Sequence, residues 1–192
     1  MLTTLALVLA GAPAQQAPPQ ANWRTIATPA DRARLRGWRA SWMTALARIR
    51  GAGKGAEITR AAGLFDPDVA LPRPVPPAGR YRCRTIKLGA KSESLLEYVA
   101  YPPFACQFDG LRFVKSGGSQ RMEGSIYRDG AARAVFLGTL VLGDERRAIR
   151  YGRDAQRNIA GFVERIGPRR WRLVLPAPAF ESLLDIVEIT PR

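Results

Sequence analysis

The chain has 192 residues, which is enough for one domain and a short targeting segment, and 46% of its residues are apolar, which is enough for a packed core. Lysine and arginine number 30 against 16 aspartates and glutamates, so the formal net charge is +14, and there is no histidine. The lack of histidine excludes Ser–His and Cys–His catalytic pairs and every histidine metal site. Two cysteines alone disfavour a zinc site, and we expect neither a metal nor a cofactor.

Arginine carries most of the positive charge, because the sequence contains only four lysines. The guanidinium group suits phosphate and carboxylate groups, so an anionic partner is one interpretation of this composition. The arginines are spread along the whole chain without a long run of like charges. This spread favours the other interpretation, in which arginine is the ordinary surface residue of the protein.

The N-terminal residues have the pattern of an export signal. Residues 2–10 are largely apolar but too few for a membrane span of about twenty residues, and Ala12-Pro13-Ala14 follows as a cleavage pattern of small residues. We predict a signal peptide at residues 1–14, a flexible leader at residues 15–22, and a periplasmic or secreted mature protein without a membrane span. The usual basic start of such a signal is missing, which leaves a buried N-terminal segment as the alternative.

A helix is predicted to begin at Thr28, which can cap it, with Pro29 at its first position. Gly51 and Gly53 are expected to end this helix, and a second, short helix is expected at residues 55–62. Apolar side chains recur at spacings of three and four and form one helix face, which consists of Leu35, Trp38, Trp42, Leu46 and Ile49. We expect this face to pack on the core of the domain; the alternative is a face that binds a partner.

A proline-rich connector and a series of strands are predicted after the helices. Residues 71–79 contain four prolines, which excludes a helix or a central strand there. From residue 80 onward apolar residues alternate with polar ones, and turn signals such as Asp109-Gly110 and Asp129-Gly130 separate the segments. The strand candidates are residues 80–87, 98–108, 111–115, 122–127, 132–142, 159–166, 170–175 and 184–189, and Pro102-Pro103 interrupts the second.

These elements predict an α+β fold. An N-terminal helix or helix pair packs on an antiparallel sheet of about eight strands, which is enough to close a small barrel that holds one ligand. Closure of the barrel is left open, because turn spacing does not encode strand order. We expect one domain at residues 23–192, with a helical part at 23–65, the connector at 66–79 and the β part at 80–192.

The two cysteines, Cys83 and Cys106, both lie in candidate strands. In an exported chain two cysteines of one small domain usually pair, so we predict a disulfide between them. Pairing requires the two Cα atoms to lie within about 7 Å, which means that the two strands must be neighbours. The alternative is a pair of buried free thiols.

Arginines alternate with aromatic residues in two C-terminal segments, where they could form an anion-binding patch. The candidates are Arg146, Arg147, Arg150, Arg153, Arg169, Arg170 and Arg172. We do not expect nucleic acid as the partner of an exported protein, so anionic envelope polymers or lipid headgroups are the better candidates. The alternative is a solvated strand face with alternating arginines.

Several carboxylates lie toward the C-terminus, and two of them could form an acid–base pair across a cleft. They are Asp144, Glu145, Asp154, Glu164, Glu181, Asp185 and Glu188. The alternative is that each is paired with a neighbouring arginine, and we assign no catalytic residue.

Several short motifs occur along the chain, which are YRCR at 81–84, IKLG at 86–89, YPPF at 101–104 with Cys106, GSQR at 118–121, FLG at 136–138, YGRD at 151–154, IGPRRW at 166–171 and FES at 180–182. Together they resemble a family of exported proteins of Gram-negative bacteria that is known only as a domain of unknown function. The resemblance covers about Trp23 to Pro191 and implies one domain in the cell envelope, without assigning site residues.

The leading functional hypothesis is a periplasmic binding or envelope-associated module for a small or anionic ligand. It rests on the predicted, partly closed sheet and the surplus of arginine. The alternatives are a non-catalytic accessory interaction protein and, third, a carboxylate-based hydrolase. An open apolar cavity inside the sheet would favour the binding module. A packed interior with an exposed apolar patch would favour the interaction protein. Two carboxyl groups that face each other across a cleft, at least one with a raised pKa, would favour the hydrolase. The oligomeric state is not predicted.

Overall fold

The computed structural model describes residues 21–61, 63–118, 120–143 and 145–192. The predicted signal peptide and most of the predicted leader lie outside the described residues. The helices are α1 (Trp23–Ile26), α2 (Pro29–Arg36), α3 (Trp38–Gly51) and α4 (Gly55–Arg60). The strands are β1 (Gly79–Ala90), β2 (Tyr98–Ala100), β3 (Phe104–Asp109), β4 (Arg112–Lys115), β5 (Gln120–Arg128), β6 (Arg133–Leu142), β7 (Asn158–Gly167), β8 (Arg170–Pro176) and β9 (Ser182–Pro191).

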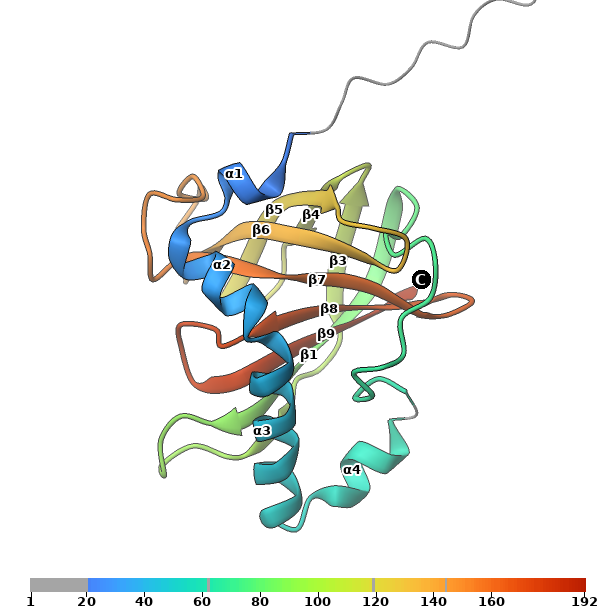
Figure 1. Cartoon of the computed structure of the whole chain (residues 1–192), viewed down its shortest axis with the longest axis vertical. Helices are drawn as coiled ribbons and strands as arrows, with labels where there is room; N and C mark the ends of the chain where they lie inside the picture. Colours follow the sequence, from blue (N-terminus) through green and yellow to red (C-terminus); the bar gives the residue numbers. More distant parts are fainter. Residues whose placement is uncertain (1–20, 62, 119, 144) are drawn as a thin grey trace, which may run out of the picture.

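Eight of these strands form a closed antiparallel barrel. From β3 to β9 each strand pairs with the next along the chain, and β1 closes the ring by pairing with β3 on one edge and β9 on the other (Figure 1). The β1–β9 pairing extends from Tyr81↔Pro191 to Ala90↔Ser182. The predicted α+β architecture is confirmed, and the open question of closure is answered, because β1 joins β3 and β9, the two ends of the strand order.

The edge of β1 that faces β3 is shared by two short strands. Its first half pairs with β3 from Gly79 to Cys83, and its second half pairs with the extra strand β2 from Ile86 to Leu88. Pro102 and Pro103 separate the two strands, because proline lacks the N–H that a ladder requires. This is the interruption expected from the sequence. Beyond Cys83, β1 has β2 instead of β3 as its neighbour on this edge. Because β2 does not continue the ring, the barrel is open at this end.

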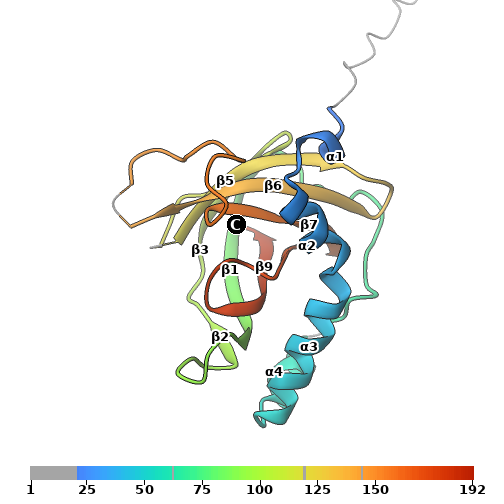
Figure 2. The ribbon, with the colours of Figure 1, turned by 60° about the vertical axis from the view of Figure 1, so that its left-hand side comes forward.

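The side chains of the strands alternate between two separate cores. The barrel interior contains, among others, Cys83, Phe108, Phe113, Phe136, Ile126, Val163, Leu173 and Val187. The outer face of β1 and β6–β9 is also buried, because α2 and α3 cover it (Figure 2). In β8, for example, Trp171 and Leu173 belong to the interior while Val174 packs under the helices. Strands that are buried on both faces explain the long apolar runs in this half of the sequence.

The predicted first helix is divided in two at Gly37. Thr28 caps α2 by accepting a hydrogen bond from the Asp31 amide at 3.1 Å, as expected. Gly37 ends α2 and begins α3, because glycine weakens a helix interior. Leu35, Trp42, Leu46 and Ile49 are buried against the barrel, so the apolar face packs on the protein's own core. None of the helices in the described ranges is long and apolar enough to cross a membrane.

A buried ion pair attaches the segment after α4 to the barrel. Arg172 is fully buried, and its guanidinium lies 2.6 Å from the carboxylate of Glu164, which is 1% exposed. The same guanidinium donates hydrogen bonds to backbone carbonyls between residues 63 and 69, which are those of Gly63, Leu64, Asp66 and Val69. Arg172 therefore fastens the start of the connector to β8, and breaking the ion pair would leave a charge buried without its partner.

The predicted disulfide is present. Cys83 and Cys106 are joined across the neighbouring strands β1 and β3, with their Cα atoms 5.9 Å apart. Both residues are buried in the barrel interior, where they are 0% and 3% exposed. The bond lies in the packed layer of the interior, between the two ends of the barrel.

Candidate functional site

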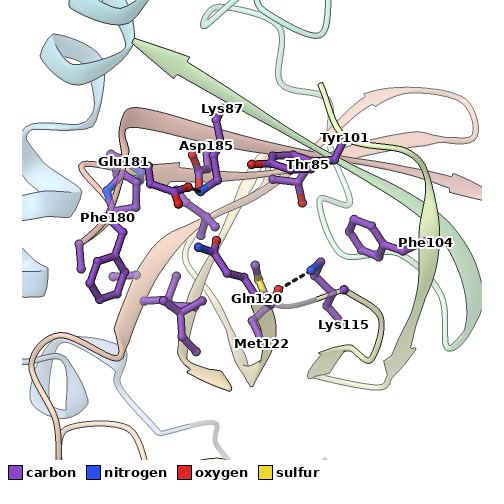
Figure 3. A pocket seen from close by; sticks show the side chains of 18 of the residues that line it. Thr85, Lys87, Tyr101, Phe104, Lys115, Gln120, Met122, Phe180, Glu181 and Asp185 are labelled. Carbon is purple, nitrogen blue, oxygen red and sulfur yellow. Dashed lines mark hydrogen bonds and ion pairs between the residues drawn. The ribbon is translucent and has the colours of Figure 1, made fainter. Parts of the chain in front are cut away.

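A cavity of about 390 Å³ opens at the end of the barrel where β1 loses β3 as its neighbour. Figure 3 shows Lys115 and Phe104 on one side of it, and Lys87, Asp185 and Glu181 on the other. Inward-facing side chains of five strands form much of its apolar lining, which includes Phe104 (β3), Met122 (β5), Leu140 (β6), Ile159 (β7) and Leu175 (β8), and β1 adds the polar Thr85. The cavity is thus part of the barrel interior and not a surface groove.

Lys115, the last residue of β4, projects into this cavity. The residue is only 6% exposed, and its Nζ donates hydrogen bonds to the backbone carbonyls of Gly117 (2.9 Å) and Gln120. The ammonium also lies 4.4 Å from the centre of the Phe104 ring, which it faces. Among the described residues no carboxylate forms an ion pair with Lys115. Burial lowers the pKa of Lys115 to about 8, helped by the positive charges of Lys87 and Arg121, so the amine is still mostly protonated at pH 7.

Lys87, on the opposite wall, has carboxylate partners. Its Nζ lies 3.1 Å from Asp185 and 3.1 Å from Glu181, and the Ser182 hydroxyl donates a hydrogen bond to the other oxygen of Asp185. Burial alone would lower the pKa of Lys87, but the two carboxylates outweigh it and raise that pKa. Burial raises the pKa of Asp185, although Lys87 and Ser182 favour its charged form. The charge of Lys87 is therefore compensated by two carboxylates of the same wall, unlike that of Lys115.

One polar group of the cavity has no hydrogen-bond partner among the described residues. The hydroxyl of Thr85 is buried and has no hydrogen-bond partner in the described structure. Buried hydroxyl groups are usually satisfied, so this one is an orphan that a ligand or water can complete. Thr85 and Lys115 thus offer an unsatisfied polar atom and an uncompensated charge within one apolar cavity.

The predicted anion-binding arginines are not brought together in one place. Arg146, Arg147, Arg150 and Arg153 are exposed on the connection between β6 and β7. Arg170 pairs with Glu188 at 2.6 Å, and Arg169 lies at the opposite end of the barrel from Lys115. Arg172 is buried and all its described contacts are structural, so we exclude it from a ligand site. Anion binding by the exposed members stays a prediction.

Most of the candidate carboxylates are paired with a basic side chain. Glu145 is bonded to Arg157, Glu164 to Arg172 and Glu188 to Arg170. Asp144 lies outside the described residues. Glu181 and Asp185 do come together in the cavity, and the pKa of Asp185 is raised, but Lys87 bridges the two carboxylates. An acid–base pair for hydrolysis needs room for substrate between the two groups, and here an ammonium occupies that place.

A comparison with models of protein families assigns the chain to a known family. The model of the family described as a domain of unknown function, DUF4893, matches residues 23–189. The chain belongs to the DUF4893 family. The resemblance noted in the sequence motifs is thereby confirmed over nearly the same range. Searches among curated proteins and among solved structures found no match. The description of the DUF4893 family assigns no activity, so we infer the function from the cavity.

Proposed function

We propose that this DUF4893 chain is an exported binding module that holds a small ligand in the cavity at the open end of the barrel. The ligand has an apolar body and an anionic head group. The observation that carries this proposal is Lys115, a buried and mostly protonated amine that faces an apolar cavity without a carboxylate partner. A buried charge is costly unless it is paired, and an anionic ligand would pair it.

The size and lining of the cavity support this assignment. Its volume of about 390 Å³ falls in the range of small-molecule sites, which are mostly apolar with a few fixed polar groups. The aromatic and aliphatic side chains Phe104, Met122 and Leu140 suit an acyl chain or ring, while the Thr85 hydroxyl suits a second oxygen of the head group. Export is supported by the Cys83–Cys106 disulfide, which is typical of an oxidising compartment.

A role as an accessory interaction protein is the second candidate. The hairpin between β1 and β2 extends away from the barrel (Figure 1), and it carries Leu96, which is 74% exposed, next to Leu95, which is 40% exposed. Exposed apolar side chains at the tip of a hairpin are suited to a protein partner. Native mass spectrometry of the protein purified from its own envelope separates the candidates, because a retained small ligand supports the first and a retained polypeptide the second.

Replacing Lys115 by methionine should weaken the binding of an anionic amphiphile and spare a neutral one. We expect the affinity for decanoate to fall by at least about tenfold, because a charge-assisted hydrogen bond is lost, whereas decanol should bind Lys115→Met as well as it binds the wild type. Isothermal titration calorimetry with both compounds measures this difference. Lys54→Met, which removes an exposed lysine at the start of α4, is the matched control and should bind decanoate normally. Equal loss of both compounds, or no loss of decanoate, would contradict the assignment of Lys115.

The decanoate affinity should also depend on pH in one direction. Because burial lowers the pKa of Lys115 to about 8, the amine is charged below that pH and becomes neutral above it. The affinity should therefore be constant between about pH 6 and 7.5 and fall above pH 8, by at most about tenfold per pH unit. In Lys115→Met the profile should be flat across the same range. A wild-type profile that is flat, or that rises with pH, would show that Lys115 does not pair with the carboxylate.

A further inference from the structure

A second cavity, of about 520 Å³, lies at the other end of the barrel and shares no lining residue with the first. The strands show its position: Tyr81 at the start of β1 and Trp171 at the start of β8 line it, whereas Lys87 and Leu175, farther along the same strands, line the first cavity. Residues of the proline-rich connector and the last residues of the chain are part of its lining.

The lining of this second cavity is strongly basic. It contains no aspartate or glutamate, and its arginines are Arg73, Arg80, Arg165, Arg169 and Arg192. Within the described ranges none of these side chains forms an ion pair, in contrast to Arg133, Arg157, Arg170 and Arg172, which all have carboxylate partners. Four of the five are exposed and Arg165 is half-buried, so their charges together make the potential around the cavity positive, which favours an anion.

Two buried donors of residues that line this cavity lack an acceptor within the described part of the chain. Arg165 and Trp171 are directly paired between β7 and β8, and both line the cavity. The Nε1 of Trp171 and the Nε of Arg165 are buried without a hydrogen-bond partner, and Trp171 is only 6% exposed. Buried N–H groups are nearly always satisfied, so these two point to a missing acceptor. The charge and the orphan donors are independent observations that indicate the same kind of ligand.

The backbone holds the rim of the cavity in place. The amide of Leu71 donates to the carbonyl of Arg165 at 2.8 Å, and the amide of Arg73 donates to the carbonyl of Ala131 at 3.0 Å. Arg73 has a φ of 61°, a conformation that is uncommon for a residue other than glycine. These contacts fix the connector across the barrel end, where Arg73 and Arg165 line the same cavity.

We propose that this second cavity binds an anionic group that bears a phosphate. A lone carboxylate has two oxygens, which is too few acceptors for several guanidinium groups and an indole N–H, whereas phosphate groups offer more oxygens and match the arginine fork. The group belongs either to a small soluble phosphate compound or to the headgroup of an anionic lipid. This site is independent of the one that contains Lys115.

Inorganic pyrophosphate is the probe for a soluble ligand. We expect it to shift the indole Nε1–H resonance of Trp171 in an ¹⁵N-labelled sample, because this group gains an acceptor. The indole resonances of Trp38 and Trp42, which belong to α3 and do not line the cavity, should stay in place. Trp171→Phe assigns the resonance. Vesicles of phosphatidylglycerol, compared with vesicles of phosphatidylcholine, are the probe for a lipid headgroup, with cosedimentation as the readout.

The double variant Arg165→Gln/Arg169→Gln should weaken binding of whichever probe binds by at least about tenfold at fixed ionic strength. The control is Arg36→Gln/Arg50→Gln, which removes the same charge from exposed positions of α2 and α3 and should leave binding unchanged. Arg169→Gln alone, at an exposed position, serves if the double variant does not fold.

The outcomes separate the two sources and can overturn the proposal. Pyrophosphate binding with a shifted Trp171 resonance identifies a soluble phosphate ligand. Binding to phosphatidylglycerol vesicles alone, lost in the double variant, identifies a lipid headgroup. The proposal fails if neither probe binds, if the control variant weakens binding as much as the Arg165 and Arg169 variants do, or if pyrophosphate binds without moving the Trp171 resonance.

Discussion

Replacing Glu164 by glutamine should lower the free energy of unfolding by about 3 to 5 kcal/mol, which is the usual cost of removing one partner from a buried ion pair. Glu164 is 1% exposed and its carboxylate faces the guanidinium of Arg172, which is fully buried, at 2.6 Å. The substitution keeps the shape of the side chain and removes its charge, so the charge of Arg172 loses its compensation. Arg133, which also bonds to Glu164, loses the same partner. Urea unfolding monitored by circular dichroism measures the change.

The matched control is Glu123→Gln on the barrel surface. Glu123 pairs with Arg112 at 3.1 Å, but both side chains are substantially exposed, at 36% and 59%. Exposed pairs contribute about 0 to 1 kcal/mol, so this variant should unfold at nearly the wild-type urea concentration. If Glu164→Gln costs no more than Glu123→Gln, the buried pair does not stabilise the attachment of the connector. The double variant Glu164→Leu/Arg172→Met should recover part of the loss, because no unpaired charge remains.

Local patterns predicted the strands because most strand boundaries have local causes. Asp109-Gly110 and Asp129-Gly130 lie at tight turns, and Pro102-Pro103 separates β2 from β3 where the interruption was expected. The closure of the barrel, in contrast, has no local cause in the sequence. It depends on the pairing of β1 with β9, which joins residues as distant as Tyr81 and Pro191. A pairing of this kind follows from the summed twist and tilt of all the strands, which no single segment encodes.

Closure also decides which side chains form the site. Lys115 follows Phe113 with the alternation of a strand, so both face the same way, but only a closed ring makes that face the interior. The sequence alone does not single out Lys115 as a site residue, because lysine is rarely buried. The signal available in the sequence was that Lys115 lies two residues after Phe113 in a short apolar strand, and therefore on the same face as Phe113.

Arg172 was predicted to belong to an exposed anion-binding patch, and its burial has a related reason. In a sheet with one solvated face, the arginines that alternate with Trp171 and Leu173 would face water. Here α3 and the segment after α4 cover that face, so Arg172 is buried under them. The second cavity has no local signal in the sequence, because Arg73 and Arg80 lie more than eighty residues before Arg165.

Removing the disulfide should lower the free energy of unfolding by about 3 kcal/mol, because the bond closes a loop with a sequence separation of 23 residues and so restricts the unfolded chain. The variant is Cys83→Ala/Cys106→Ala, which adds no polar group to the interior. Since the two sulfurs lie in the packed layer between the two cavities, both cavities should keep their shape in the folded variant. Urea unfolding of the oxidised wild type, the reduced wild type and the double variant measures the change.

Burial makes the same bond resistant to reduction in the folded state. Cys83 and Cys106 are 0% and 3% exposed, so dithiothreitol can reach the sulfurs only when the barrel opens. We expect the native protein to gain no alkylated thiols after hours in dithiothreitol, and to gain two rapidly once urea unfolds it, as measured by intact mass after iodoacetamide treatment. Rapid reduction without urea would show that β1 and β3 separate in the native state. Equal stability of the oxidised and reduced proteins would show that the sheet, and not the cross-link, holds these strands together.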